Sequence, residues 1–140
     1  MKIVKNAISY VIYNKDKILV VLRPPTDNEL PNVWGLPAGS LKEGESFEQA
    51  VVRSGREKLG VDLKVVKLIN EGDLEREKYV LHMEEYEVEI VTGEPVVPQG
   101  IEGITQYSEY KWAEPEILKE AAKKGSLCTQ LYLSSIGISW

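Results

Sequence analysis

The sequence is poor in cysteine and histidine and lacks a long hydrophobic run. Its single cysteine, Cys128, cannot form a disulfide within the chain. Together with the absence of a signal-peptide pattern, this shortage predicts an intracellular, cytoplasmic protein. The apolar run at residues 7–13 is too short to span a bilayer, and charged residues follow it closely, so we expect no membrane association. The one histidine, His82, has no partner visible in the sequence, and we assign it no role.

The charge balance also narrows the range of partners. The formal net charge of −5 argues against a general nucleic-acid-binding surface, although a local basic pocket is compatible with it. The hydrophobic fraction of 43% and the charged fraction of 28% are ordinary for a globular protein. Because no repeat, low-complexity tract or linker interrupts the chain, we expect residues 1–140 to form a single domain.

Several segments have the composition of β-strands. Residues 3–13 and 18–23 are apolar on both alternating faces, which predicts strands that are covered on both sides. A third strand is expected at residues 63–71, followed by a turn at Gly72 and Asp73. A long strand should then run from about residue 78 to residue 91.

The apolar residues of this long strand change parity between Met83 and Tyr86. One extra residue near Glu84 and Glu85 would restore a single apolar face, so we predict a β-bulge there. Glu85 and the alternate glutamates after it would then form a polar face. A loop is expected at residues 92–106, then a strand at 107–112 and two short C-terminal helices.

Residues 34–61 predict a loop followed by a capped helix. Ser46 is a suitable N-cap with Gln49 as its reciprocal partner, and Gly60 can end the helix in the left-handed conformation. At 100° per residue, the inward face comprises Phe47, Ala50, Val51, Ser54 and Lys58, with Glu57 at its margin. Leu59 falls on the opposite face. Gly55 costs about 1 kcal/mol relative to alanine inside a helix, so we expect the backbone of another segment close to its Cα.

The same segment resembles the Nudix box, G-x5-E-x7-R-E-U-x-E-E-x-G-U, where U is a bulky apolar residue. The positions that match at the correct spacing are Gly39, Glu45, Arg53, Glu57, Gly60 and Val61. Trp34, Leu36 and Pro37 also follow the usual entry of the family, W-x-L-P-x-G. The resemblance implies a Nudix fold, in which a mixed β-sheet is sandwiched between α-helices in an α/β (α+β) architecture.

The departures from the box concern its metal ligands. In the family, glutamates of the box hold divalent metal ions that neutralise a diphosphate and activate water. Ser54 and Lys58 stand here in place of two of these glutamates, and Gly55 replaces the apolar residue. Glu57 is the one retained glutamate of the three.

The resemblance also implies which residues form the site. Glu57 and Glu45 are the candidate metal ligands and catalytic groups, and Glu102 is a further candidate ligand or base from the long loop. Plainer alternatives are a helix-surface ion pair between Glu57 and Arg53, and a solvated Glu102. The expected substrate-binding residues are Lys58, Arg53 and Gly39.

The resemblance favours hydrolysis of a nucleoside diphosphate linked to another moiety, at a reduced rate because the box is degenerate. Mg²⁺ or Mn²⁺ would be weakly bound with help from substrate phosphates, and the Lys58 ammonium would contact a phosphate or pair with Glu57 in place of a metal. The alternative is a catalytically impaired Nudix domain that binds a nucleotide or RNA without hydrolysing it. The expected partner is a nucleotide-type small molecule, and a homodimer is compatible with the sequence.

Overall fold

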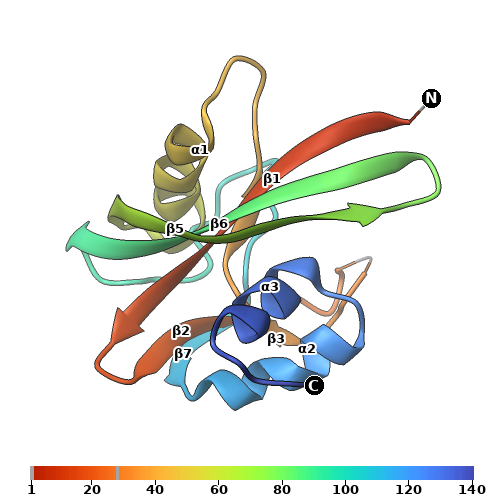
Figure 1. The fold of residues 1–140 in the computed structure, drawn as a ribbon. Coiled ribbons are helices and arrows are strands. Elements are labelled where there is room, and N and C mark those ends of the chain that lie inside the picture. Colours follow the sequence, from red (N-terminus) through yellow and green to blue (C-terminus); the bar gives the residue numbers. More distant parts are fainter. Residues whose placement is uncertain (1, 28) are drawn as a thin grey trace.

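The computed structural model describes residues 2–27 and 29–140, and a seven-stranded sheet forms its centre (Figure 1). The strands are β1 (Ile3–Asn14), β2 (Lys17–Leu22), β3 (Trp34–Gly35), β4 (Ala38–Ser40), β5 (Asp62–Glu75), β6 (Tyr79–Thr92) and β7 (Glu109–Ala113). The main order is β3-β2-β1-β6-β5, while β4 pairs with β1 and β7 pairs with β2. Because β1 is parallel to β6 but antiparallel to β2 and β4, the sheet is mixed, as predicted.

Helices cover both faces of the sheet. They are α1 (Phe47–Ser54), the π-helical turn η1 (Gly55–Leu59), the 3₁₀ turn η2 (Pro115–Leu118), α2 (Lys119–Lys123) and α3 (Leu127–Ser135). Helix α1 lies on one face and α3 on the other, which confirms the predicted sandwich (Figure 1). Within the described residues, each helix is too short or too polar to cross a bilayer.

The central strand β1 shows why both of its faces are apolar in sequence. Ile8, Tyr10 and Ile12 pack in one cluster with residues of α1, whereas Ala7 and Val11 pack in a second cluster with residues of α3. All five side chains are almost completely buried. Burial of this apolar surface on both sides of one strand stabilises the sandwich.

The predicted turn at Gly72 and Asp73 is wrong, because β5 continues to Glu75. Gly72 has a packing role instead. A Cβ placed on Gly72 would lie 3.0 Å from Cδ2 of Leu131 on α3, so the missing side chain allows the helix to approach the strand. The connection to β6 follows at residues 76–78.

The predicted bulge at Glu84 and Glu85 is also wrong. Strand β6 pairs with β1 without interruption through this region. The register shifts of the β5–β6 hairpin lie at Asp62/Leu63, Val65/Lys67 and Leu68/Asn70. The parity change has another cause: Met83 belongs to the cluster beneath α3, whereas Tyr86 belongs to the cluster beneath α1. Glu85 consequently points toward α3 rather than to solvent and is fully buried.

The helix of the box begins as predicted but ends differently. The Ser46 hydroxyl accepts a hydrogen bond from the Gln49 amide at 3.1 Å, and the Ser46 amide donates to the Gln49 side chain at 2.9 Å. Gly60 ends the helix with φ of 71°. Leu59 is fully buried instead of lying on the outer face, because the wide π-helical turn changes the angular step along η1.

Gly55 lies at the start of this π-helical turn. A Cβ at this position would lie 2.5 Å from Cδ1 of Leu63 and 3.3 Å from the carbonyl oxygen of Val61. The expected close approach is therefore present, although its nearest atoms belong to a side chain and only the Val61 oxygen to the backbone. The packing of β5 against η1 accounts for a glycine in the interior of the helix.

Candidate functional site

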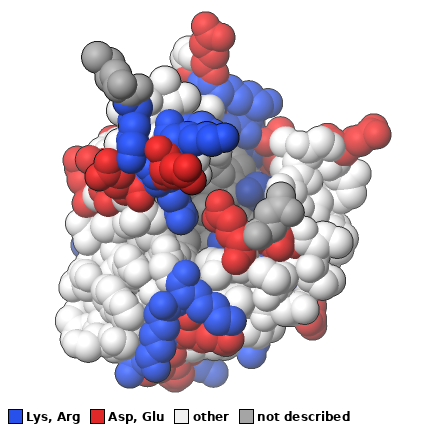
Figure 2. All heavy atoms as spheres, turned by 90° about the vertical axis from the view of Figure 1, so that its right-hand side faces the viewer, with Lys and Arg blue, Asp and Glu red and all other residues white. Residues whose placement is uncertain are grey.

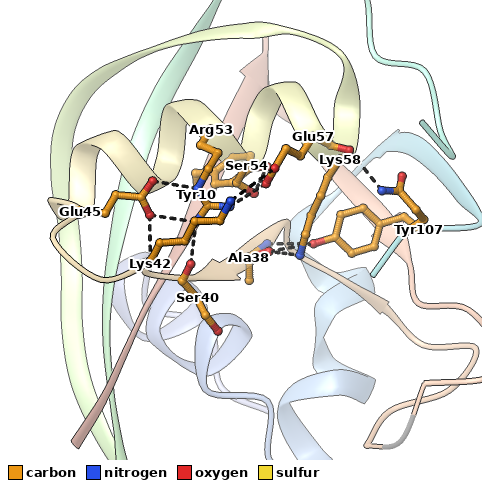
Figure 3. A network of polar contacts seen from close by, with 11 residues as sticks. Tyr10, Ala38, Ser40, Lys42, Glu45, Arg53, Ser54, Glu57, Lys58 and Tyr107 are labelled. Atoms are coloured by element: carbon orange, nitrogen blue, oxygen red, sulfur yellow. Dashed lines mark hydrogen bonds and ion pairs between the residues drawn. The ribbon is translucent and has the colours of Figure 1, made fainter. Parts of the chain in front are cut away.

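Arg53 joins the glycine-rich loop to the helix. Its Nε and Nη2 each donate to a carboxylate oxygen of Glu45 at 2.8 Å. Nη2 also donates to the Ser40 carbonyl at 2.8 Å, and Nη1 donates to Glu57 Oε1 at 2.6 Å (Figure 3). The planar guanidinium suits such a forked arrangement. Four hydrogen bonds from one side chain thus fix the loop, the carboxylate before the helix and the last turn.

Charge pairing dominates the electrostatics of this cluster. Hydrogen bonds from Arg53 lower the pKa of Glu45 to about 2, against an opposing effect of burial. The same contacts raise the pKa of Arg53. The second oxygen of Glu57 lies 4.0 Å from the Lys42 ammonium. Both retained glutamates of the box therefore already face cationic side chains.

This donor set does not fit a resident Mg²⁺ or Mn²⁺ ion. Both carboxylate oxygens of Glu45 and one of Glu57 accept hydrogen bonds from Arg53. Glu102 is exposed, and no hydrogen bond or ion pair joins it to another described residue. In the described part of the chain, no three His, Cys, Asp or Glu side chains come close enough to hold a metal ion. Magnesium prefers several oxygen ligands in near-octahedral geometry.

Lys58, like Arg53, extends from the helix to β4, where it reaches the opposite end of the strand from Ser40. Its ammonium donates to the Ala38 carbonyl at 2.5 Å and lies 5.2 Å from the centre of the Tyr107 ring. The Tyr107 hydroxyl accepts from the Ala38 amide at 2.9 Å and lies 3.2 Å from the Ala38 carbonyl, so Lys58 and Tyr107 contact the same residue (Figure 3). The expected pairing of Lys58 with Glu57 is not found among the described contacts. The ammonium instead contacts β4 at the residue before Gly39 of the box.

Ser54 occupies the apolar face of α1 without leaving its hydroxyl unsatisfied. The hydroxyl lies 3.0 Å from the Tyr10 hydroxyl on β1, and both side chains are buried. Burial, together with the nearby Tyr107, raises the pKa of Tyr10, which keeps it a neutral hydrogen-bonding partner. Gly39 packs alongside, since a Cβ there would lie 3.5 Å from Ser54 Oγ. The serine is therefore part of a hydrogen-bonded core contact.

Lys58 lines a cleft of about 630 Å³, which we call the basic cleft. The two segments of the box that reach it contribute Ala38, Gly39, Ser40 and Lys58. Its charged side chains are the cations Lys5, Arg23, Lys58, Arg76 and Lys124 and the acids Asp27 and Glu29. Figure 2 shows the face onto which the cleft opens, hollowed near its centre, with both Lys and Arg and Asp and Glu side chains around the hollow. Glu45, Arg53 and Glu57 line a separate open groove beside β5.

Tyr79 and His82 lie in surroundings that differ from the sequence interpretation, which favours core packing for a tyrosine on an apolar strand face and assigns no partner to His82. Tyr79 lies at the basic cleft, partly exposed, with the Lys5 ammonium 4.3 Å from its ring centre. His82 does have a partner, because its Nδ1 lies 2.6 Å from Asp73 on β5. Phe47 of α1 packs edge-on against its ring. The strand pairing of His82 with Asp73 creates this contact, and no local sequence pattern indicates it.

A mixed sheet between helices, with a glycine-rich loop tied by arginine to the following helix, defines a Nudix-type domain. The NUDIX domain model matches residues 4–129, so the chain belongs to the Nudix family. No curated protein matches the chain. The similarity to solved structures extends over nearly its whole length.

Three solved structures illustrate this similarity. A NUDIX hydrolase from Nitrosomonas europaea has a TM-score of 0.74 at 18% identity, covering 95% of this chain and 88% of that one. The ORF135 protein of E. coli has a TM-score of 0.70 at 19% identity, with coverage of 95% and 91%. An ADP-ribose pyrophosphatase from Streptococcus suis has a TM-score of 0.58 at 18% identity, with 90% of each chain covered. At these identities the similarity establishes the fold.

Proposed function

We propose that the chain binds a nucleoside diphosphate linked to another group, with the diphosphate near Lys58, and that it hydrolyses this ligand slowly. The supporting observation is the Lys58 ammonium, which is held at the Ala38 carbonyl in the basic cleft. A volume of about 630 Å³ is within the range of small-molecule sites, which favours a nucleotide over RNA. A cytoplasmic location and homodimer formation stay predictions.

The position of Lys58 explains both parts of the proposal. A diphosphate concentrates negative charge, and an ammonium beside the glycine-rich loop supplies part of the positive charge that binding needs. The same ammonium opposes a divalent ion. Two unit charges about 4 Å apart interact by roughly 4 kcal/mol at an effective dielectric of 20, so a divalent ion nearby would be repelled by at least a comparable amount.

Metal-dependent pyrophosphohydrolysis at a substantial rate is the second candidate. It is favoured by Glu45 and Glu57, which lie on either side of Arg53. For this activity Mg²⁺ or Mn²⁺ would have to bind together with the substrate, since the carboxylates already have cationic partners. Glu102 would have to approach from its loop to complete the predicted catalytic set.

Calorimetry and a turnover assay separate these candidates. ADP and ADP-ribose are titrated into wild type, Lys58→Ala and the matched control Lys17→Ala, which changes an exposed lysine at the start of β2. We expect Lys58→Ala to weaken binding about tenfold, as loss of a charged contact implies, and Lys17→Ala to leave it unchanged. Unchanged binding in Lys58→Ala would contradict the proposal.

Turnover is then measured with Mg²⁺ and Mn²⁺ in wild type, Lys58→Glu and the double variant Ser54→Glu, Lys58→Glu. We expect slow wild-type turnover and stronger metal binding in the variants. The single variant keeps the test interpretable if a glutamate at the buried position 54 prevents folding. Fast wild-type turnover that is lost in these variants would instead establish a hydrolytic site of another design.

A further inference from the structure

The basic cleft carries cations at a second place, remote from Ala38. Ala38 pairs with Ser9 of β1, whereas Lys5 lies four residues earlier on the same strand. At about 3.3 Å per residue, these positions are about 13 Å apart. Arg76 adjoins Lys5, because its amide donates to the carbonyl of Tyr79, the residue whose ring lies under the Lys5 ammonium. The two sets of cations are therefore anchored at separate parts of the cleft.

Neither of these two cations is fully neutralised by the described residues. Lys5 forms no ion pair with a described residue, and its ammonium lies 4.3 Å from the centre of the Tyr79 ring. Arg76 has one ion-pair contact, a long one of 3.9 Å to Glu29. Its Nε is buried and has no acceptor in the described part of the chain. A buried N–H without an acceptor is costly, and an anion bound in the cleft could accept from it.

The lining between the two places is largely apolar. Ala7 of β1 and Leu81 and Met83 of β6 lie on the sheet face that lines the cleft, with Leu127 of α3 above them. The cleft as a whole carries five cations and two carboxylates, in a chain whose net charge is −5. Such a distribution suits a ligand with two anionic ends and a less polar middle.

We propose that Lys5 and Arg76 form a second anion subsite, which binds a further phosphate or similar anionic group of the ligand. The inference rests on the proposed function for the first anion, at Lys58. The ligand is then a nucleoside diphosphate derivative with an additional anionic group, separated from the diphosphate by a sugar, base or other less polar group. Two anions occupy the cleft together.

The test is an NMR titration of the folded protein with two simple probes. ADP is added first, and inorganic phosphate is then titrated into the ADP-saturated protein. We expect phosphate to shift the amide signals of Lys5, Arg76 and Tyr79 at millimolar concentration without displacing ADP. The double variant Lys5→Gln, Arg76→Gln should lose at least fivefold in phosphate affinity and keep its affinity for ADP, whereas Lys17→Gln should match wild type.

The outcomes distinguish this subsite from the proposed function. Phosphate that displaces ADP, or shifts only signals near Ala38, would show a single anion site and overturn the inference. An equal loss of ADP and phosphate affinity in the double variant would also overturn the inference, because Lys5 and Arg76 would then attract all anions in the cleft without forming a specific site. If ADP fails to bind but phosphate still shifts Lys5 and Arg76, the proposed function fails and the subsite stands.

Discussion

The buried carboxyl group of Glu85 should make the stability of this protein depend strongly on pH. Glu85 is fully buried between β6 and α3, and its one hydrogen bond comes from the Ser9 hydroxyl at 2.6 Å. Its other oxygen has no partner among the described residues. Burial raises its pKa to about 8, and the groups facing it from α3 are the neutral Cys128 and Tyr132. We predict that Glu85→Gln stabilises the protein at alkaline pH.

The magnitude follows from the two pKa values. A rise from 4.5 to about 8 corresponds to about 5 kcal/mol at 1.36 kcal/mol per pH unit. In wild type, the free energy of unfolding keeps this contribution below pH 4.5 and loses it as the pH rises toward 8, because Glu85 ionises in the unfolded chain before it ionises in the folded one. The uncharged glutamine avoids that loss, although an amide hydrogen without an acceptor costs about 1–3 kcal/mol. The expected net gain at pH 8.5 is about 3 kcal/mol.

Urea unfolding followed by tryptophan fluorescence measures this difference at pH 4.5, 6.5 and 8.5. The advantage of Glu85→Gln should be absent at pH 4.5 and grow with pH. Glu87→Gln is the matched control, because Glu87 lies on the same strand but is only half-buried and has Lys67 4.0 Å away. An advantage of Glu85→Gln that is the same at all three pH values would refute the reasoning.

Three other predictions concern the box and its surroundings. Gly55→Ala should lower the free energy of unfolding by about 1–3 kcal/mol, because the new Cβ would lie 2.5 Å from Leu63; an equally stable variant in urea unfolding would contradict this. Arg53→Lys should raise the pKa of Glu45 from about 2 toward its ordinary value, since one ammonium cannot reproduce the fork; carboxyl NMR titration measures this. The hydrogen bond with the Asp73 carboxylate raises the pKa of His82 in the folded protein. The stability that this interaction contributes is therefore complete below pH 6.5 and is lost as the pH rises through the pKa of the folded state. His82→Gln should lack this pH dependence in unfolding experiments at pH 5.5 and 8.5.

The elements that the sequence predicted correctly depend on local patterns. The capping box of Ser46 and Gln49 involves groups three residues apart, and the two-sided apolar character of β1 is visible within one strand. The spacing of the Nudix box likewise indicates the family before any contact is known. These features need no knowledge of distant packing partners.

The features that sequence reasoning missed depend on contacts between distant segments. The parity change in β6 arises because two different helices cover its two faces, and Gly72 is required by α3 rather than by a turn. Leu59 is buried because a π-helical turn replaces the regular helix. The direction of Lys58 is set by Ala38, twenty residues earlier, which no periodicity within the helix could indicate.

The register shifts in β5 disfavour self-association through this edge of the sheet. This strand ends the main order of the sheet, and Val66 and Leu68 on it are 43% and 45% exposed. An exposed apolar edge normally attracts a strand from another molecule, as in aggregation. The irregular pairing at Val65/Lys67 and Leu68/Asn70 twists and bends the edge, so that a foreign strand finds no long regular row of backbone partners. A dimer formed at this edge would therefore have to use side-chain packing rather than extend the sheet from β5.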